Sequence, residues 1–367
     1  MSGLRAGDGR LAALDGLRGV AALAVVILHG AKIFQLGWAP HHAYLAVDFF
    51  FLLSGYVIAR AFDRRLTAGW AWPFIKRRLI RLYPLIVVGC VLGFAVLAAR
   101  AALAGDFDLR PPLVDLASSL LLSPAPPIFA SKWHYYKPDP VLWSLFFEVA
   151  VNIVYALAAP WLRGARLWGL VLLSGAGLGL SAVLIGNADF GLVHFPLATF
   201  RVLFSFFVGV AMARAFVPEK MGGRLSTRTH VYIFAILSVI LLSPLEMGPA
   251  YDLFAILVVF PVLLLLTLMS EPPGRWANSC LLAGTLSYPI YMIHHPIFRA
   301  EANLLTMLDV GVAGRTVGFA VGVLVVGAAS WVLAKAFDEP VRKWLTARLP
   351  DGGRKTFTLE AGSPRRL

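Results

Sequence analysis

Charged residues are scarce in this sequence. Only 14% of its 367 residues are Asp, Glu, Lys or Arg, whereas about a quarter is usual for a soluble protein. Hydrophobic residues make up 59% of the chain. This composition excludes an ordinary soluble protein and predicts an integral membrane protein.

Cysteines and acidic residues are also few. The two cysteines, Cys90 and Cys280, both lie in apolar runs, which argues against a disulfide framework or a thiolate metal site, and we expect no metal. Lys and Arg outnumber Asp and Glu by 33 to 20, giving a net charge of +13. Such an excess can indicate nucleic-acid binding. Here the basic residues lie in short segments between apolar runs, where they set membrane topology, so we expect no nucleic-acid partner.

Apolar stretches long enough to cross a bilayer recur along the chain. They predict an all-α, polytopic membrane helical bundle with about ten transmembrane helices. We expect residues 1–345 to form one integral-membrane domain and residues 346–367 to form a basic, disordered cytoplasmic tail. The predicted spans are 12–35, 45–62, 79–104, 141–162, 166–186, 195–216, 230–245, 250–270, 279–299 and 312–337.

The distribution of basic residues predicts the orientation of these spans. With both termini in the cytoplasm, 24 Lys and Arg lie in cytoplasmic segments and 7 in external ones. Cytoplasmic loops carry the excess of Lys and Arg in membrane proteins. The sequence therefore predicts an N-in, C-in, multi-pass protein of the cell inner membrane.

The first predicted span carries an arginine and a histidine 11 positions apart, Arg18 and His29. At about 100° per residue this spacing is three turns plus about 20°, so both side chains lie on one helix face. They are separated by a rise of about 16 Å, a little over half the hydrocarbon thickness. One face thus carries a cation near the inner surface and a titratable imidazole deeper in the membrane. This arrangement suits a long substrate with an anionic head group.

Several polar residues are predicted to lie at similar depth in the outer half of the membrane. An ionisable group inside a bilayer costs roughly 2.5–3.5 kcal/mol by insertion scales, so each one needs a reason. The alternative is that each is an isolated packing or snorkelling residue. The residues that share this layer, drawn from several spans, are His29, Asp48, Ser54, Glu148, Arg201 and His294.

A basic stretch opens the third predicted span on the cytoplasmic side. Arg78 and Arg81 in this stretch are i, i+3 neighbours on one helix face. Arginines so placed can bind phosphate through bidentate hydrogen bonds. An ordinary positive-inside anchor is the competing interpretation, but Arg18 near the same surface favours phosphate binding.

Six motifs follow one another along the chain: Arg18-x10-His29, 49–56, 74–84, Trp143-Ser144-Leu145-x-x-Glu148, 287–296 and Glu339-Pro340. With these motifs in this order, residues 11–345 resemble the membrane acyltransferase-3 family, whose members modify O-antigens, exopolysaccharides, Nod factors and some antibiotics. The resemblance implies acyl transfer from cytoplasmic acyl-CoA to an acceptor on the outer side. Two departures from the family pattern are expected to bear on acceptor choice: Val149 follows Phe147 and Glu148 where further polar residues are usual, and His295 replaces a usual aromatic.

The resemblance implies that Arg18 and His29 are required for activity and that Arg78 and Arg81 correspond to the family's arginines. We expect His29 to act as general base on the acceptor hydroxyl, with Glu148 orienting it as the third member of a triad. A transiently acylated His29 is the variant route. Arg18, Arg78 and Arg81 are expected to hold the coenzyme A phosphates, with the pantetheine arm running along the bundle. The pocket and acceptor residues are expected to be Asp48, Ser54, Trp143, Ser144, Arg201, Tyr288 and His294.

The expected function is thus an acyl-CoA-dependent O-acyltransferase, with acetyl as the default acyl group and carbohydrate as the default acceptor. Acyl-CoA serves as co-substrate, and no bound cofactor is expected. The alternative is a membrane transporter of a sugar or lipid-linked precursor, which polar residues near the midplane would also suit. The sequence shows no inverted repeat, which argues against that alternative.

Overall fold

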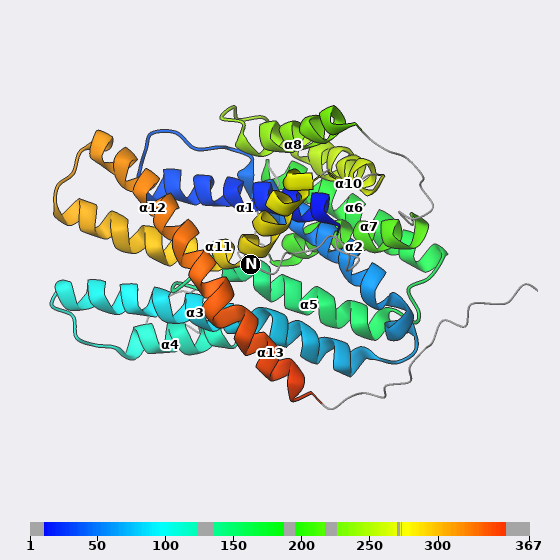
Figure 1. Cartoon of the computed structure of the whole chain (residues 1–367), viewed down its shortest axis with the longest axis horizontal. Helices are drawn as coiled ribbons and strands as arrows, with labels where there is room; N and C mark the ends of the chain where they lie inside the picture. Colours follow the sequence, from blue (N-terminus) through cyan, green and yellow to red (C-terminus); the bar gives the residue numbers. More distant parts are fainter. Residues whose placement is uncertain are drawn as a thin grey trace, which may run out of the picture.

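The computed structural model of the chain is a bundle of helices (Figure 1). It describes residues 11–123, 136–186, 195–216, 226–269, 272 and 274–349, and these residues contain no β-strand. The elements are α1 (Ala12–Ile33), η1 (Ala43–Leu45), α2 (Ala46–Thr67), α3 (Ala71–Leu103), α4 (Arg110–Leu120), α5 (Leu142–Ala158), α6 (Ala165–Ile185), α7 (Phe195–Ala215), α8 (Thr227–Leu242), α9 (Pro249–Phe254), η4 (Ala255–Val259), α10 (Phe260–Leu268), α11 (Gly274–Met307), α12 (Val312–Val332), η5 (Leu333–Asp338) and α13 (Glu339–Ala347).

The prediction of an all-α membrane bundle is confirmed, and every predicted span coincides with helix. Within the described residues, 7 helical stretches are long and apolar enough to cross a membrane, and α5 and α8 are shorter apolar helices. The helix over the predicted span 279–299 is in neither group, so the number of about ten spans stays a prediction. Three helices extend well beyond their predicted spans, since α2 ends at Thr67, α3 begins at Ala71 and α11 runs from Gly274 to Met307. Hydropathy marks only the roughly 20 residues inside the hydrocarbon, and a helix can continue beyond it. The N-in, C-in orientation stays a prediction, and the expected tail lies almost wholly outside the described residues.

Small residues let α1 lie directly against α11. A Cβ atom added to Gly19 would lie 2.6 Å from the Cβ of Ala283, and one added to Gly284 would collide with the side chain of Asp15. Helices in membranes associate through such small residues, which allow close backbone approach. The contact holds the α1 face that carries Arg18 and His29 against α11.

A second close contact joins α2 to α7. A Cβ atom on Gly55 would collide with the carbonyl oxygen of Phe206, and one on Gly209 would collide with that of Leu52. The two backbones therefore touch at two glycines, and only glycine fits at either position. This contact fixes the position of α2, which carries Ser54 on the turn next to Gly55.

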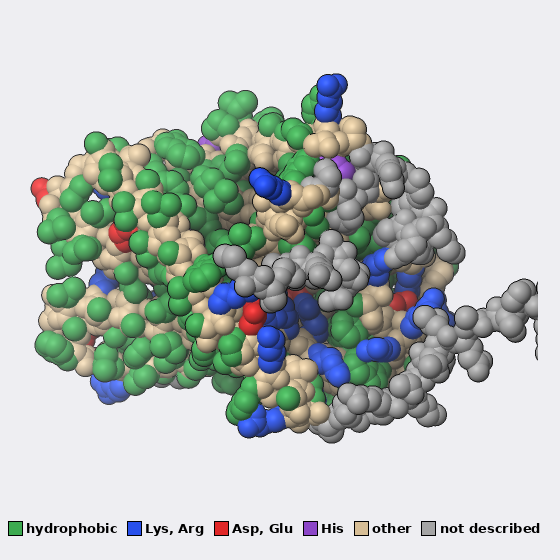
Figure 2. Space-filling model, in the orientation of Figure 1, with side chains coloured by type: hydrophobic (Ala, Val, Ile, Leu, Met, Phe, Trp, Pro, Cys, Tyr) green, Lys and Arg blue, Asp and Glu red, His purple; other side chains and the backbone are tan. Residues whose placement is uncertain are grey.

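Hydrophobic side chains cover much of the visible surface, as expected for a protein facing lipid (Figure 2). Lys and Arg side chains gather around α13, which crosses α3 in the foreground of Figure 1. Arg342 of α13 and Arg81 of α3 both bind Asp338, at 2.8 and 3.8 Å. The C-terminal helix is therefore tied to the basic beginning of α3, on the side predicted to be cytoplasmic.

Candidate functional site

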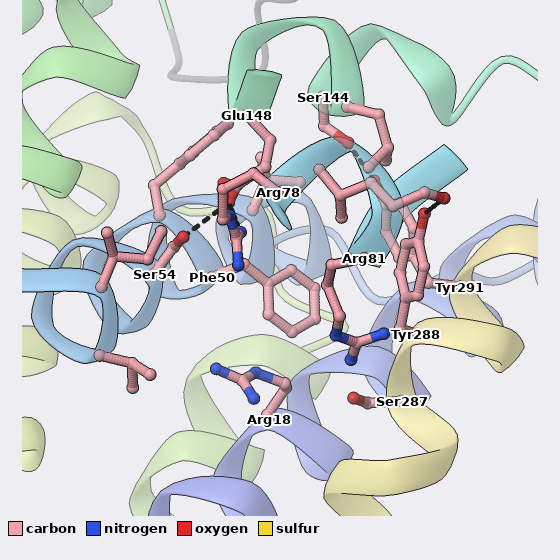
Figure 3. Close-up of a pocket in the computed structure, with 16 residues that line it drawn as sticks. Arg18, Phe50, Ser54, Arg78, Arg81, Ser144, Glu148, Ser287, Tyr288 and Tyr291 are labelled. Atoms are coloured by element: carbon pink, nitrogen blue, oxygen red, sulfur yellow. Dashed lines mark hydrogen bonds and ion pairs between the residues drawn. The ribbon is translucent and has the colours of Figure 1, made fainter. Parts of the chain in front are cut away.

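A cavity of about 260 Å³ lies between α1, α2, α3, α5 and α11 (Figure 3). Each helix contributes at least one polar side chain, and apolar side chains from α2, α3 and α5 fill the remaining wall. The lining residues are Arg18, Val47, Phe50, Phe51, Ser54, Val57, Ile58, Arg78, Arg81, Leu82, Ser144, Leu145, Glu148, Ser287, Tyr288 and Tyr291.

Three arginines and one carboxylate give this cavity its charge. Arg18 comes from α1, and Arg78 and Arg81 come from neighbouring positions on one face of α3. Arg78 Nε and Arg81 Nη1 are buried and have no hydrogen-bond partner among the described residues, although Arg81 Nη1 lies 3.8 Å from Asp338 Oδ2, beyond hydrogen-bond distance. A buried guanidinium donor without an acceptor is costly. These donors therefore favour an anionic ligand that accepts from them. The structure thus brings together the three predicted phosphate-binding residues.

Glu148 is the acceptor at the centre of a polar cluster on the cavity wall. Its Oε1 atom accepts hydrogen bonds from Ser54 Oγ at 2.6 Å, Arg78 Nη2 at 2.7 Å and Asn152 Nδ2 at 3.0 Å. The expected pairing of Glu148 with His29 is therefore wrong. The sequence predicts only depth in the membrane, and depth does not determine the direction in which a side chain points around its helix. On α5, Glu148 points towards α2 and α3.

The hydrogen-bonding partner of His29 lies on α11. His29 Nδ1 is 2.8 Å from His294 Nε2, and the two rings are nearly parallel, with centroids 5.1 Å apart. His295 meets the same ring edge-on, with a centroid separation of 5.6 Å. His294 is fully buried, whereas His29 is half-buried. The outer group of the predicted site is therefore a pair of imidazoles.

His29 does not line the cavity, and Tyr291 lies at the boundary between the two parts. Tyr291 lines the cavity, and its ring centroid is 6.0 Å from that of His294. Its hydroxyl is 2.7 Å from Ser144 Oγ, and its ring packs edge-on against Phe50. Among the described residues this cavity therefore does not extend to His29, and the expected continuous passage from the inner arginines is not seen. Sequence reasoning missed Tyr291, although its position three residues before His294 on one helix could have identified it.

Asp48 and Arg201 form a fully buried ion pair. Arg201 Nε donates to Asp48 Oδ1 at 2.8 Å, and Arg201 Nη2 donates to Oδ2 at 2.6 Å and to the carbonyl oxygen of Tyr44 at 2.8 Å. Both side chains are 0% exposed, and neither lines the cavity. Trp143 lies with its ring centroid 5.9 Å from Arg201 Cζ and is also outside the lining. These three predicted pocket residues therefore brace the helices around the cavity.

Three of the four other predicted pocket residues line the cavity. Ser54, Ser144 and Tyr288 all face it (Figure 3). Tyr288 donates its hydroxyl to the carbonyl oxygen of Leu82 at 2.6 Å, and its ring lies 5.3 Å from the guanidinium carbon of Arg81. This contact ties α11 to α3 and holds Arg81 in place. His294 lies outside the lining, beside His29.

Comparison with known proteins identifies the family to which the chain belongs. The acyltransferase-3 profile, described as an acyltransferase domain, matches residues 11–335. The chain is 40% identical over 162 residues to "Protein 2 in picA locus" of Rhizobium radiobacter, a match that covers 40% of the chain and 81% of that protein. It is 27% identical over 238 residues to proteins named "Putative O-acetyltransferase" in Staphylococcus aureus strains COL and MSSA476. The staphylococcal matches cover 57% of the chain but only 35% of each relative. No solved structure shows significant similarity to the chain.

Proposed function

Since the chain belongs to the acyltransferase-3 family, we propose that it transfers an acyl group from cytoplasmic acyl-CoA to a hydroxyl of an acceptor on the outer side of the cell inner membrane. A multi-pass membrane protein with acyltransferase character follows already from the family and the helices. The proposal adds the donor, the side of the membrane and the acceptor. Acetyl is the default acyl group, and a carbohydrate hydroxyl is the default acceptor.

The observation that supports the donor is the set of arginines around the cavity. Arg18, Arg78 and Arg81 converge on one space, and Arg78 and Arg81 each have a buried N–H donor that makes no hydrogen bond within the described part of the chain. Coenzyme A carries phosphates at one end, and arginine binds phosphate through paired hydrogen bonds. The cavity, at about 260 Å³, is below the range of about 300–1,000 Å³ typical of pockets for whole drug-sized ligands. We therefore place the pantetheine arm in the cavity and the nucleotide at its arginine-lined end.

The proposed reaction uses His29 as general base. His29 accepts the proton of the acceptor hydroxyl, whose oxygen attacks the thioester carbonyl carbon. A C–O ester bond forms, the C–S bond breaks, and the proton passes from His29 to the leaving thiolate, which departs as coenzyme A thiol. Tyr291 has to move for the thioester to reach His29, because it borders both the cavity and His294. A route through an acyl-His29 intermediate uses the same geometry and is distinguished by trapping labelled protein.

The test measures thiol release from acetyl-CoA by inside-out membrane vesicles that contain the full-length protein together with the envelope acceptors. Radiolabelled acetyl-CoA added to inside-out membrane vesicles then reports transfer to envelope material. We expect the wild-type protein to release thiol and His29→Ala to lose this activity by about 10²–10⁴-fold, the usual contribution of a general base. His41→Ala, at an exposed histidine, is the matched control. A wild-type protein that binds no acetyl-CoA and releases no thiol would instead point to a transporter.

A further inference from the structure

We infer that His294 is a positioning residue that fixes the tautomer of His29 and leaves His29 Nε2 as its basic nitrogen. The inference rests on the proposed function of His29 as general base and adds the residue that orients the His29 ring. No carboxylate plays this part in the described structure, since Glu148 binds Ser54 and Arg78 instead.

The argument starts at the far side of His294. His294 Nδ1 lies 3.0 Å from the carbonyl oxygen of Ile290, one turn earlier on α11. A carbonyl oxygen only accepts hydrogen bonds, so Nδ1 of His294 carries a proton and donates. This backbone contact sets the protonation pattern of the ring.

The second nitrogen of His294 then has to accept. A neutral imidazole with its proton on Nδ1 presents a lone pair at Nε2. A doubly protonated His294 would place a cation in a fully buried position, at the cost of desolvating it. Because His294 Nε2 is 2.8 Å from His29 Nδ1, the proton in this hydrogen bond belongs to His29. His29 Nδ1 therefore donates to His294 Nε2, and His294 Nδ1 donates to the carbonyl oxygen of Ile290.

With its proton on Nδ1, a neutral His29 ring has no proton on Nε2. Nε2 is the other nitrogen of a half-buried ring, so it is the basic site offered to an acceptor hydroxyl. When His29 Nε2 takes up a proton, His294 Nε2 still accepts from Nδ1 and stabilises the imidazolium. A carboxylate does the same for histidine in hydrolase triads. Here the partner is neutral, so its main contribution is orientation.

His295 provides a matched control inside the same cluster. It follows His294 directly in sequence and touches the His29 ring edge-on, but its Nδ1 has no hydrogen-bond partner among the described residues. Removing the His295 imidazole therefore changes the packing around His29 without removing the hydrogen bond that sets its tautomer.

The first experiment measures acetyl-CoA turnover by His294 variants of the full chain. We expect His294→Phe, which keeps a ring but cannot accept, to lower kcat by about 10²-fold with KM for acetyl-CoA nearly unchanged, because misoriented histidines in triads lose up to about 10⁴-fold. His294→Gln, whose amide oxygen can accept from His29 Nδ1, should recover part of the loss, and His295→Phe should keep most activity. Equal losses in all three variants, or a change in KM alone, would overturn the positioning role.

The second experiment does not depend on activity. Nitrogen-15 NMR of histidine-labelled wild-type protein reports which ring nitrogen carries the proton, with His29→Gln and His294→Gln assigning the signals. We expect His29 protonated at Nδ1 and unprotonated at Nε2. A proton on His29 Nε2 would overturn the inference even if the protein proves to be an acyltransferase. If no variant or wild-type protein uses acetyl-CoA but this tautomer is found, the proposed function fails and the assigned tautomer stands.

Discussion

The hydroxyl of Tyr291 lies 2.7 Å from Ser144 Oγ, and this hydrogen bond fixes the ring that borders both the arginine-lined cavity and His294. Phe50 packs edge-on against the same ring, with centroids 5.9 Å apart. Residues from α2, α5 and α11 therefore meet at a point that a thioester would have to pass in the proposed reaction. In that reaction, we expect this boundary to keep water away from the thioester until an acceptor is present.

Opening this boundary should separate thioester cleavage from transfer. We expect Tyr291→Ala to raise acceptor-independent hydrolysis of acetyl-CoA about tenfold and to lower the fraction of acetyl groups that reach envelope material, because water gains access to the thioester. Ser144→Ala, which removes only the hydrogen bond, should have a smaller effect in the same direction. Thiol release and label transfer are measured in parallel on vesicles. An unchanged ratio of the two in Tyr291→Ala would contradict a boundary at this residue.

Arg81 should contribute to donor binding through the phosphates alone. We expect Arg81→Gln to raise KM for acetyl-CoA about tenfold, the low end for a charged hydrogen bond, since this side chain is partly exposed and therefore screened. Asp338 still has Arg342 as an ion-pair partner, so the substitution does not leave the Asp338 carboxylate unpaired. An acetyl-pantetheine donor, which lacks the nucleotide, should show no such difference between wild type and variant.

The control for Arg81→Gln is Arg163→Gln. Arg163 lines a different cavity, next to Gly164 and Trp168 at the beginning of α6. Loss of acetyl-CoA affinity in both variants would indicate a general effect of positive charge rather than a site around Arg81.

The buried pair of Asp48 and Arg201 should act on stability. Removing one member of a buried ion pair leaves an uncompensated charge and typically costs about 3–5 kcal/mol. We expect Asp48→Ala to lower the thermal midpoint in detergent strongly, and Arg201→Met to do the same. The double variant Asp48→Leu, Arg201→Met removes both charges and should recover most of the loss. If the double variant is as unstable as the sum of the single ones, the two residues do not act as a pair.

Asp139 should make stability depend on pH. It lies fully buried in the segment before α5, outside the helices, and burial raises its pKa well above 3.8, outweighing the opposing effects of the Val141 N–H and Arg299. Below about pH 4 the carboxyl is protonated in both states. As pH rises, the unfolded chain releases this proton first, so folding stability falls until the pKa of the folded state is passed.

Asp139→Asn removes this titration. We expect its thermal midpoint, relative to wild type, to improve as pH rises from about 4.5 to about 8. Asp108→Asn is the control, because hydrogen bonds from Arg110 lower the pKa of Asp108 and no gain is expected at that exposed site. A constant difference between Asp139→Asn and wild type across this pH range would show that Asp139 is ionised in the folded protein.

Sequence reasoning identified the helices and the positions along them better than the contacts between them. Apolar length predicted the bundle, and the 11-residue spacing placed Arg18 and His29 on the α1 face that meets α11. The distribution of basic residues predicted how deep each polar side chain lies in the membrane, but neither its lateral position nor its direction. The rotation of each helix about its axis depends on packing, for instance at Gly19 and Gly284, and hydropathy does not predict that rotation. Glu148 was therefore expected beside His29, although its carboxylate meets Arg78.

The ion pair illustrates the same limit. Asp48 and Arg201 were both recognised as costly residues within the membrane, but they lie 153 positions apart, and nothing in the sequence links them. Each was therefore expected in the pocket. Only the approach of α2 and α7 shows that each one neutralises the other.

The glycine contact between α2 and α7 extends to the polar wall of the cavity. Gly55 touches the backbone of α7, while Ser54, the residue before it, donates its hydroxyl to Glu148. A larger residue at position 55 would force the two helices apart and draw the Ser54 hydroxyl away from the carboxylate. The distance between α2 and α7, set at Gly55, therefore also sets whether Ser54 reaches the Glu148 carboxylate that binds Arg78. A substitution at Gly55 would change helix packing and, with it, the binding of an anion in the cavity.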